Sequence, residues 1–518
     1  MAEPAKKLVS DVAQSSNTTR DISKEIQGRR SNELIIGLCG AIGSGVKTLK
    51  HNLISSLKAS GYEIVDIRLS SFIIDHFKSK EIGLENLKGF DRYNKYQDLG
   101  DELRELFTCS ILAEHSIAKI KKTRYEIYEK QKIKQPEGKV TINAHKVAYL
   151  IDQVKHPDEV KLLKEVYGRN FYLIGLLRNS EQRKKNLSDE QISLQNIATL
   201  MERDRKDKGR FGQQVEKTLQ KSDYFIKNID DKSCFKSSVE RFVKLVHGID
   251  NLTPTTLETG MYYAYSASVR SACLSRQVGA AICDDNGVVL STGCNDVPKF
   301  GGGLYQSEDI HDMRCFNKGG QCQNDFHKSI LKDQIVETLR NSNVGNPEKI
   351  AASIMTDTKA QSIIEYSRAV HAEMDAIVSL ARSLRDTSVG KTLYCTTYPC
   401  HVCTRHIIAA GIKKVVYIEP YEKSLANDLY DDSLTTDELS TTKVVFDNFE
   451  GTAPSRYTYF FRYRNARKDT TGKLIEHSYS TVNHSDPQYL DGYGDYEVKV
   501  TANLQEILSE KGLLIEGN

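Results

Sequence analysis

The chain has 518 residues, more than one hydrophobic core usually organises, so we expect two or three domains. Its 72 Lys and Arg residues against 69 Asp and Glu leave a net charge of +3, which argues against a strongly basic nucleic-acid-binding protein. No signal peptide or apolar run of membrane-spanning length is found, so we expect a cytoplasmic protein with reduced thiols and no membrane partner.

The N-terminal half begins with a polar segment, residues 1–31, which is predicted to form a mobile leader or a surface-docked arm. Residues 34–39 (LIIGLC) form a short apolar run that is typical of a buried parallel strand. A helix is predicted over residues 46–59, and further strands at 62–69, 149–151 and 171–174. This alternation predicts an α/β domain over residues 32–250, with a parallel sheet covered by helices on both faces.

A glycine-rich loop, GAIGSGVKT from Gly40 to Thr48, joins the first of these strands to the first helix. Backbone N–H groups at a helix start cradle phosphate in P-loops, which have the pattern G-x-x-x-x-G-K-[ST]. Here Val46 holds the place of the lysine and Lys47 comes one residue late, a rotation of about 100° that is expected to turn it away from the β- and γ-phosphates. The candidate nucleotide-binding residues are Gly40, Gly43, Ser44, Gly45, Lys47, Thr48 and Asp152.

Asp152 ends a predicted strand, where a Walker B-type acid would hold Mg²⁺ beside a bound nucleotide. Residues 152–160, 203–213 and 222–228 resemble the post-strand segment, the charged lid and the last strand of small-metabolite P-loop kinases. We therefore expect this domain to bind a nucleotide in a regulatory or assembly role, without phosphoryl transfer. The alternative is that the glycines only close a tight turn in a domain that binds nothing.

The alternation of helices and strands breaks at residues 248–256, where we place the domain boundary. Strands at 277–282 and 288–292 flank an Asp-Asn-Gly turn and predict a β-hairpin. A glycine-rich insertion follows at 299–320. The second domain is predicted to span residues 256–470, and the polar, aromatic tail at 471–518 stays unassigned.

The most informative motif is His371-Ala-Glu373 followed by Pro-Cys400-His-Val-Cys403, the H-x-E…P-C-x-x-C spacing of zinc nucleobase deaminases. One imidazole and two thiolates leave the fourth position on Zn²⁺ open for water, which separates a catalytic from a structural site. Glu373 is then the catalytic acid and base. The alternatives are a Cys-x-x-Cys redox pair, which does not need the His-Ala-Glu segment, and a zinc knuckle, which needs a fourth nearby ligand. Around the motif, helices are expected at 366–382 and 403–410, and strands at 391–397 and 415–419.

The insertion contains a candidate second metal site, with two histidines and two cysteines spaced as H-x3-C-x6-C-x4-H. Four such ligands could close a structural tetrahedral site and order a segment that has little apolar content. The alternative is that they are scattered side chains near the mouth of the catalytic pocket. The four residues are His311, Cys315, Cys322 and His327.

Residues 256–461 resemble deoxycytidylate deaminases. Beyond the zinc motif, residues 276–282 (RQVGAAI) look like that family's first core strand, and residues 293–298 (GCNDVP) are similar to its G-x-N-G-x-P loop. The resemblance implies a cytidine deaminase-like α/β/α sandwich, a hydrolase acting on a cyclic amidine, and contact of Asn295 with the nucleotide sugar. Arg276 is a candidate phosphate contact, with a surface salt bridge as the alternative. Asp296 replaces the family's glycine and would repel a phosphate unless a metal ion lies between them.

The order of the two domains, P-loop kinase-like and then deaminase, resembles the bacterial anti-phage deoxycytidylate deaminases. This resemblance implies conversion of dCTP and dCMP to dUTP and dUMP, which depletes deoxycytidine nucleotides and starves phage replication. It also implies a homo-oligomer whose activity is restrained in uninfected cells by a small non-coding RNA.

Two other functions stay open. A deaminase of cytosine or adenine in polynucleotides would need a basic groove with stacking aromatic residues, and the near-neutral net charge disfavours it. An RNA- or nucleotide-binding sensor with a secondary deaminase centre is motivated by the lysine-rich residues 118–139 and by the altered P-loop. That sensor would bind RNA in a salt-sensitive manner.

Overall fold

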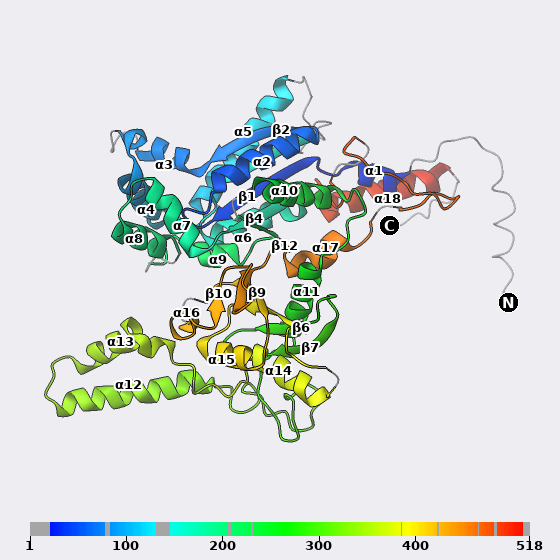
Figure 1. Cartoon of the computed structure of the whole chain (residues 1–518). Coiled ribbons are helices and arrows are strands. Elements are labelled where there is room, and N and C mark those ends of the chain that lie inside the picture. Colours follow the sequence, from blue (N-terminus) through cyan, green and yellow to red (C-terminus); the bar gives the residue numbers. More distant parts are fainter. Residues whose placement is uncertain are drawn as a thin grey trace.

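The computed structural model of the chain describes residues 21–77, 83–130, 146–205, 209–228, 231–384, 386–421, 424–464, 466–480 and 484–510. It contains two six-stranded sheets, each covered by helices, which form an N-terminal and a C-terminal body (Figure 1). The mixed α/β class predicted from the sequence is therefore observed.

The N-terminal sheet has five parallel strands in the order β5-β4-β1-β3-β2. Its central strands β1 and β4 are buried along their whole length, which explains their continuous apolar sequence. The predicted strands are confirmed, with ends that differ by a few residues. The strands are β1 Glu33–Gly40, β2 Tyr62–Arg68, β3 Lys146–Asp152, β4 Phe171–Leu177 and β5 Tyr224–Lys227.

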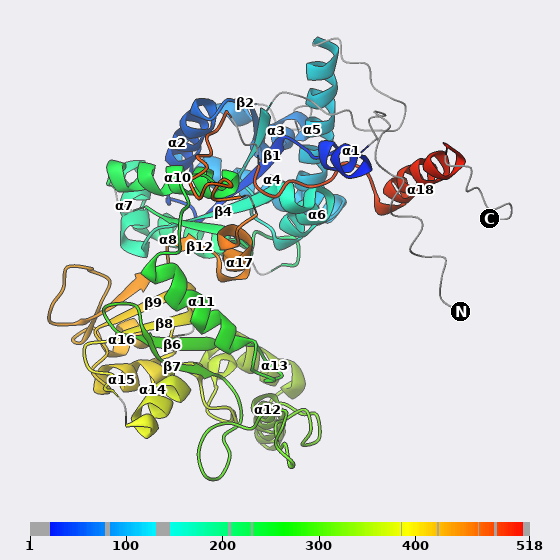
Figure 2. The same cartoon turned by 90° about the vertical axis from the view of Figure 1, so that its right-hand side faces the viewer.

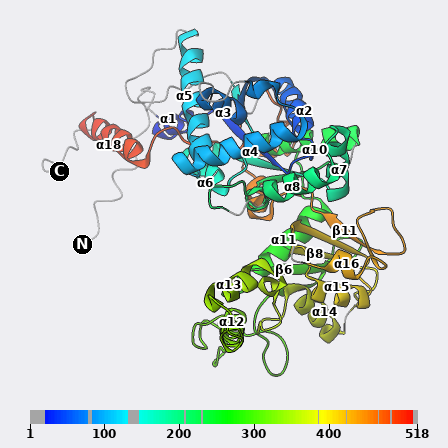
Figure 3. The same cartoon turned by 90° about the vertical axis from the view of Figure 1, so that its left-hand side faces the viewer.

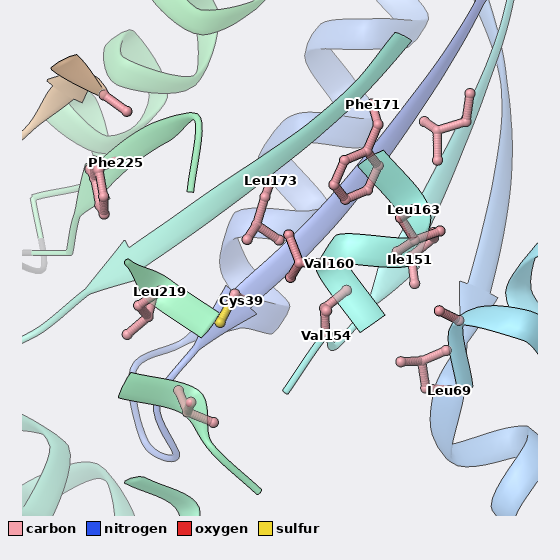
Figure 4. Close-up of a cluster of buried hydrophobic side chains, with 14 of the residues drawn as sticks. Cys39, Leu69, Ile151, Val154, Val160, Leu163, Phe171, Leu173, Leu219 and Phe225 are labelled. Atoms are coloured by element: carbon pink, nitrogen blue, oxygen red, sulfur yellow. The ribbon is translucent and has the colours of Figure 1, made fainter. Parts of the chain in front are cut away.

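Helices cover this sheet on both faces, as predicted (Figures 2 and 3). One face packs on α2 (Val46–Ala59) and α10 (Lys232–His247), and the other packs on α5 (Ile111–Lys130) and α6 (Pro157–Tyr167). Figure 4 shows the core of the second face, where Val160 of α6 lies beside Leu173 of the sheet. The other helices are α1 Ile22–Gly28, α3 Leu69–Phe77, α4 Gly89–Leu106, α7 Ser180–Asp189, α8 Leu194–Arg205 and α9 Val215–Leu219, with 3-10 turns at Leu84–Asn86 and Gly168–Asn170.

The C-terminal sheet has the order β10-β11-β9-β8-β6-β7. The predicted hairpin is confirmed, because β6 and β7 are antiparallel and Gly287, with φ +80°, lies in the turn between them. Helix α11 packs on one face, and α14 and α15 on the other, which is the predicted α/β/α layering. The elements are α11 Thr256–Ser268, β6 Gly279–Cys283, β7 Val289–Cys294, α14 Ala372–Ser383, β8 Thr392–Thr397, α15 His401–Ala409, β9 Lys414–Glu419, α16 Ala426–Leu429, β10 Leu434–Thr435 and β11 Val444–Asn448.

A helical hairpin projects from the C-terminal body between β7 and α14 (Figure 1). It consists of α12 (Gln323–Asn341) and α13 (Pro347–Asp357), followed by a 3-10 turn at Lys359–Ser362, and it was not predicted from the sequence. The predicted helix over residues 366–382 starts later, at Ala372, because His371 has the extended conformation of an N-cap residue, with ψ 152°.

The chain returns to the first sheet after β11. The short strand β12 (Gly451–Thr452) pairs antiparallel with β5 at the edge of the N-terminal sheet. Phe449 is fully buried, and its ring centroid lies 6.0 Å from that of Phe225 in β5. The buried Asp223 accepts a hydrogen bond from Nε of Arg456 at 2.8 Å. The C-terminal sheet thus ends at β11, and the chain after it contacts both bodies, since Tyr457 stacks on Tyr262 of α11 at 4.1 Å. The predicted domain end at residue 470 stays a prediction.

The C-terminal tail also lies against the N-terminal body (Figure 2). Nη2 of Arg29 lies 2.6 Å from Oδ1 of Asp491, and His484 is buried beside the ring of Tyr172. The described part of the predicted leader, residues 21–31, is therefore docked, whereas residues 1–20 lie outside the described residues. No helix in the described ranges is both long and apolar enough to cross a membrane. The last elements are a 3-10 turn at Pro454–Arg456, α17 Tyr457–Phe461 and α18 Tyr493–Glu510, which contacts α1.

Removing the ring at the junction of the two bodies should destabilise the protein. Phe449→Ala empties a fully buried site, a change that typically lowers the free energy of unfolding by about 3–5 kcal/mol. Thermal unfolding followed by circular dichroism should therefore show a lower apparent Tm. Phe300→Ala removes a fully exposed ring and is the matched control, which should melt as the wild type does. An unchanged Tm for Phe449→Ala would contradict the role given to this contact.

Candidate active site

The three predicted zinc ligands come from the starts of two helices. His371 is the N-cap residue of α14, and Cys400 is the N-cap residue of α15, whose first turns contain Cys403. The Sγ atom of Cys400 accepts a hydrogen bond from the N–H of Cys403 at 3.4 Å. Unpaired N–H groups at helix starts stabilise a thiolate, which is the form of cysteine that binds a metal ion.

The ligand atoms have the spacing of a tetrahedral zinc site. Nδ1 of His371 lies 3.4 Å from Sγ of Cys400 and 3.3 Å from Sγ of Cys403. Zn–S bonds of about 2.3 Å and a Zn–N bond of about 2.1 Å at tetrahedral angles separate nitrogen from sulfur by about 3.6 Å. Among the described residues, no fourth His, Cys, Asp or Glu joins this group. The donor set therefore fits a zinc ion that keeps one position open.

The electrostatics of the group also favour metal binding. Hydrogen bonds from Cys403 and His371 lower the pKa of Cys400 to about 4, and the hydrogen bond with Cys400 raises the pKa of Cys403, so the pair holds one thiolate before a metal ion binds. Glu373 is buried next to these ligands, with 4% of its surface exposed. Burial raises the pKa of its carboxyl group above the ordinary value, and the charge of His371 opposes the rise. A buried carboxyl group of this kind can take up a proton and return it.

His371, Glu373 and Cys400 line a cavity of about 160 Å³. Part of its wall, Thr397 and Tyr398, comes from the carboxyl end of β8, and part comes from the insertion that precedes α14. Aromatic walls with a few polar groups suit a planar ligand that carries hydrogen-bonding atoms. Three further wall residues are Asn324, Ile364 and Tyr421.

Comparison with known proteins identifies this centre. Residues 254–419 match the family model described as the cytidine and deoxycytidylate deaminase zinc-binding region. The deoxycytidylate deaminase of Enterobacteria phage T2 is 31% identical over 169 residues, which cover 32% of this chain and 81% of the phage protein. The deoxycytidylate deaminase of Enterobacteria phage T4 is 31% identical over 166 residues, which cover 32% of this chain and 79% of that protein. This chain belongs to the deoxycytidylate deaminase family. It is a deaminase, and hence a hydrolase.

Among solved structures, the apo dCMP deaminase from the cyanophage S-TIM5 aligns at 21% identity with a TM-score of 0.22, covering 38% of this chain and 99% of that chain. The family match lies within the C-terminal body, so residues 256–449 are called the deaminase domain, and residues 33–247 the N-terminal domain.

Asn295 and Arg276, the predicted substrate contacts of the deaminase domain, both line the zinc cavity. Oδ1 of Asn295 accepts from the N–H of Val278 at 2.6 Å, and its Nδ2 donates to the carbonyl of Arg276 at 2.8 Å. Asn295 thus fastens the loop after β7 to the segment before β6. The guanidinium group of Arg276 donates to Glu419, and to Oγ1 of Thr397 at 3.0 Å. Their roles toward a substrate stay predictions.

Asp296, the acid in the place of the family's glycine, is not among the described residues that line the zinc cavity. Its carboxylate is 2% exposed and accepts from the N–H of Ala272 at 2.9 Å and from its neighbour Val297 at 2.8 Å. The deaminase domain therefore uses this acid to hold the segment after α11, a role that sequence alone could not separate from phosphate contact.

The four candidate ligands of a second metal ion are not brought together. No three of their ligand atoms lie within 4.8 Å of one another in the described part of the chain. Cys322 is the N-cap residue of α12, and the exposed His327 lies five residues further along that helix, a rotation of about 140° that turns the two side chains apart. His311 is exposed, and Cys315 contacts the guanidinium group of Arg368 at 3.9 Å.

The glycine-rich loop of the N-terminal domain has the predicted strand–loop–helix setting. It joins β1 to α2, and Gly43 and Gly45 have φ values of +78° and +93°, which favour glycine. A cavity of about 1040 Å³ lies beside the loop, and Lys47 and Asp152 both line it. Asp152 pairs with Lys50 at 2.7 Å. Of the lysine-rich residues 118–139, those up to Lys130 belong to α5, and the rest lie outside the described residues.

Several residues of the two cavities were not predicted from the sequence. Thr397 and Tyr398 stand at the end of a predicted strand, and the carboxyl ends of strands are common places for ligand contacts, so a signal existed. No local sequence pattern marks Asn324, Ile364 or Lys50 as a cavity residue. Only the fold brings the insertion over the zinc cavity and α2 against the ends of β2 and β3.

Replacing one sulfur ligand should remove the metal. Cys400→Ser substitutes a weak hydroxyl ligand for a thiolate, and the zinc content measured by elemental analysis should fall from about one ion per chain to a small fraction of that. Cys234→Ser changes an exposed cysteine of the N-terminal domain and should keep the wild-type zinc content. Full zinc retention in Cys400→Ser would show that Cys400 is not a ligand. Two zinc ions per wild-type chain would support the predicted second metal site after all.

Proposed function

We propose that this protein hydrolyses the exocyclic amino group of free deoxycytidine nucleotides, converting dCMP and dCTP to dUMP and dUTP. The observation that carries the proposal is the three-ligand centre of His371, Cys400 and Cys403, which opens beside the buried Glu373 in a chain of the deoxycytidylate deaminase family. The phage relatives named deoxycytidylate deaminases support the choice of a free nucleotide over a polynucleotide.

In the proposed reaction, the bond between C4 of cytosine and its amino nitrogen breaks, and water supplies the oxygen of the new carbonyl group. A zinc ion held by the three ligands would act as a Lewis acid and make water a nucleophile near neutral pH. The carboxylate of Glu373 takes one proton from the water and delivers it to N3 of the ring. It then carries the second proton to the amino nitrogen, which leaves as ammonia. Burial of Glu373 keeps bulk water away from these transfers.

The sugar and phosphate contacts are proposed for Asn295 and Arg276. Arg276 is the only Lys or Arg among the described residues that line the zinc cavity, which makes it the natural partner of a phosphate. Its present partner Glu419 would exchange places with the incoming phosphate. Asn295 keeps the adjoining loop in place through its two backbone hydrogen bonds. We propose that it supports sugar binding mainly by positioning this loop.

We further propose that the activity depletes deoxycytidine nucleotides in the cytoplasm as a defence against phage, and that the N-terminal domain regulates it through a bound nucleotide. The shared sheet edge at β5 and β12 gives such regulation a physical route between the two bodies. By the same resemblance, the protein is proposed to assemble as a homo-oligomer and to be restrained by a small non-coding RNA.

Removing the carboxyl group of Glu373 should abolish turnover. Glu373→Ala removes the proton carrier, and kcat for dCMP and dCTP should fall by at least about 10²–10⁴-fold while zinc content stays the same. Ammonia release measures the rate, with single-stranded oligonucleotides as a further substrate. Glu337→Ala on the exposed surface of α12 is the control and should keep full activity. Surviving activity in Glu373→Ala, or turnover of oligonucleotides alone, would overturn the proposal.

The defence role predicts fewer phage plaques on cells that express the wild-type protein than on cells that express Glu373→Ala at the same level. The physical reason is that phage DNA synthesis needs dCTP, which only the active protein removes. Plaque counts and nucleotide pools, measured in the same infected cells, test this. Equal plaque counts with a depleted dCTP pool would refute the defence role and leave the deaminase assignment intact.

A further inference from the structure

The N-terminal domain contains a cavity that is larger than the cavity of the zinc centre. It measures about 1040 Å³ and lies at the carboxyl ends of parallel strands, where α/β domains bind ligands. Six Lys and Arg side chains line it against four Asp and Glu side chains, and two of the six, Lys155 and Arg104, pair with the buried Asp204 and Glu159 behind the wall. The position at the strand ends and the basic side chains suit an anionic ligand. The ion pairs inside the cavity indicate which kind of anionic ligand fits.

Lys50 occupies the acidic end of this cavity. Its Nζ lies 2.7 Å from Oδ2 of Asp152 and 3.2 Å from both carboxylate oxygens of Asp66, and its side chain is only 10% exposed. Asp152 ends β3, the position predicted for a carboxylate that holds Mg²⁺. Lys50 lies one helical turn after Val46, which holds the place of the P-loop lysine, so it reaches the site from the same face of α2. An ammonium group is therefore fixed between the two acids.

This arrangement changes what the site needs from solution. Mg²⁺ is usually held by one or two carboxylates together with phosphate oxygens, and it supplies positive charge to the phosphates. Here the carboxylates already bind an internal cation that can supply that charge. Lys47 and Arg92 also line the cavity, and neither forms an ion pair with any described residue. They are consequently available to phosphate oxygens.

A second observation points to a polar ligand. Gln97 of α4 lines the same cavity and is 3% exposed, yet its Oε1 has no hydrogen-bond partner among the described residues. Its Nε2 lies 3.5 Å from Oε1 of Gln213, another wall residue. A buried amide oxygen without a partner is unfavourable, and a ligand N–H group would satisfy it. The edges of nucleobases carry such donors beside acceptors that an amide can also reach.

We infer that the N-terminal cavity binds a nucleotide without a divalent cation, with Lys50 in the place of the metal ion and Gln97 facing the base. The inference rests on the nucleotide regulation proposed above and makes it specific. A site of this kind retains its ligand intact, because no metal ion is held to support transfer of a phosphoryl group. It would report the level of the nucleotide and leave the nucleotide unchanged.

Calorimetric titration of the full-length zinc-loaded protein tests the inference, with ATP and dTTP as probes because neither contains cytosine. The buffer is freed of Mg²⁺ on a chelating resin and compared with the same buffer after Mg²⁺ is added. At least one probe should bind in both, with Kd values that agree within about threefold, a difference well below the tenfold that corresponds to 1.4 kcal/mol. Binding that appears only with Mg²⁺ would overturn the inference.

Lys50→Met should weaken binding without Mg²⁺ by at least about tenfold, because it leaves Asp152 without its ion pair and Asp66 with only Arg68 beside the phosphates. Added Mg²⁺ should restore part of the affinity, since the acids are then free to hold the ion. Lys58→Met on the exposed end of the same helix is the matched control and should bind as the wild type does. Wild-type affinity of Lys50→Met in Mg²⁺-free buffer would contradict the role of Lys50.

Gln97→Leu keeps the size of the side chain and should weaken binding by about tenfold in both buffers, because it removes the amide that is placed against the base. Equal affinity for Gln97→Leu and the wild type would remove the base contact from the inference. Binding of neither probe under either condition would overturn both this inference and the proposed nucleotide regulation. The deamination assigned to Glu373 is measured separately and would not be affected by that result.

Discussion

The zinc centre depends on two helix starts that the C-terminal sheet holds beside each other. His371 and Cys400 are the N-cap residues of α14 and α15, so each ligand stands where the backbone N–H groups are unpaired. Helix α14 packs on β6 and β7, and α15 follows β8, which pairs with β6. A one-residue slip of β8 would turn its side chains to the opposite face and displace the Pro-Cys turn that follows. The distance between imidazole and thiolates is therefore set by sheet register, far more than by the motif alone.

The two cavities handle buried negative charge in different ways. The zinc cavity gathers two sulfurs and a buried carboxyl group, and the geometry of the sulfurs and the imidazole matches a metal ion that offsets their charge. The N-terminal cavity gathers Asp66 and Asp152 and offsets them with Lys50, a cation supplied by the chain itself. The first arrangement suits a bound ion that would activate water, and the second suits a phosphate group. One chain thus contains a reactive site and a site whose charges are already compensated.

The features of the fold and of the site that could be predicted are those that depend on residues close together in the sequence. Sequence patterns that extend over a few neighbouring residues predicted several elements correctly, because apolar periodicity and turn residues are local features. These elements are the hairpin of β6 and β7, the strand and helix around the Cys-x-x-Cys segment, and α2. The pairing of β12 with β5 joins residues more than two hundred positions apart, and two-residue strands have no periodicity. Asp296 shows the same limit within a site, since its hydrogen bond from the N–H of Ala272 depends on where α11 ends.

The strand β5 gives the two sites a common support. At its end, Nδ2 of Asn228 donates to the carbonyl of Ser44 in the glycine-rich loop at 2.8 Å. The preceding residue, Lys227, pairs with Asp447 of β11, and Asp447 also binds Lys414 at the start of β9 at 2.8 Å.

Strand β9 ends at Glu419, the partner of Arg276 in the zinc cavity. Gly45 packs so closely on Asn228 that a Cβ atom there would lie 2.7 Å from Nδ2, which leaves the loop little room to move without moving β5. Contiguous rigid contacts of this kind are what energetic coupling between sites requires, although contiguity alone does not set its size. A ligand that shifts the loop would thus act on the sheet that positions Arg276, and the expected effect is on substrate binding more than on the proton transfers of Glu373.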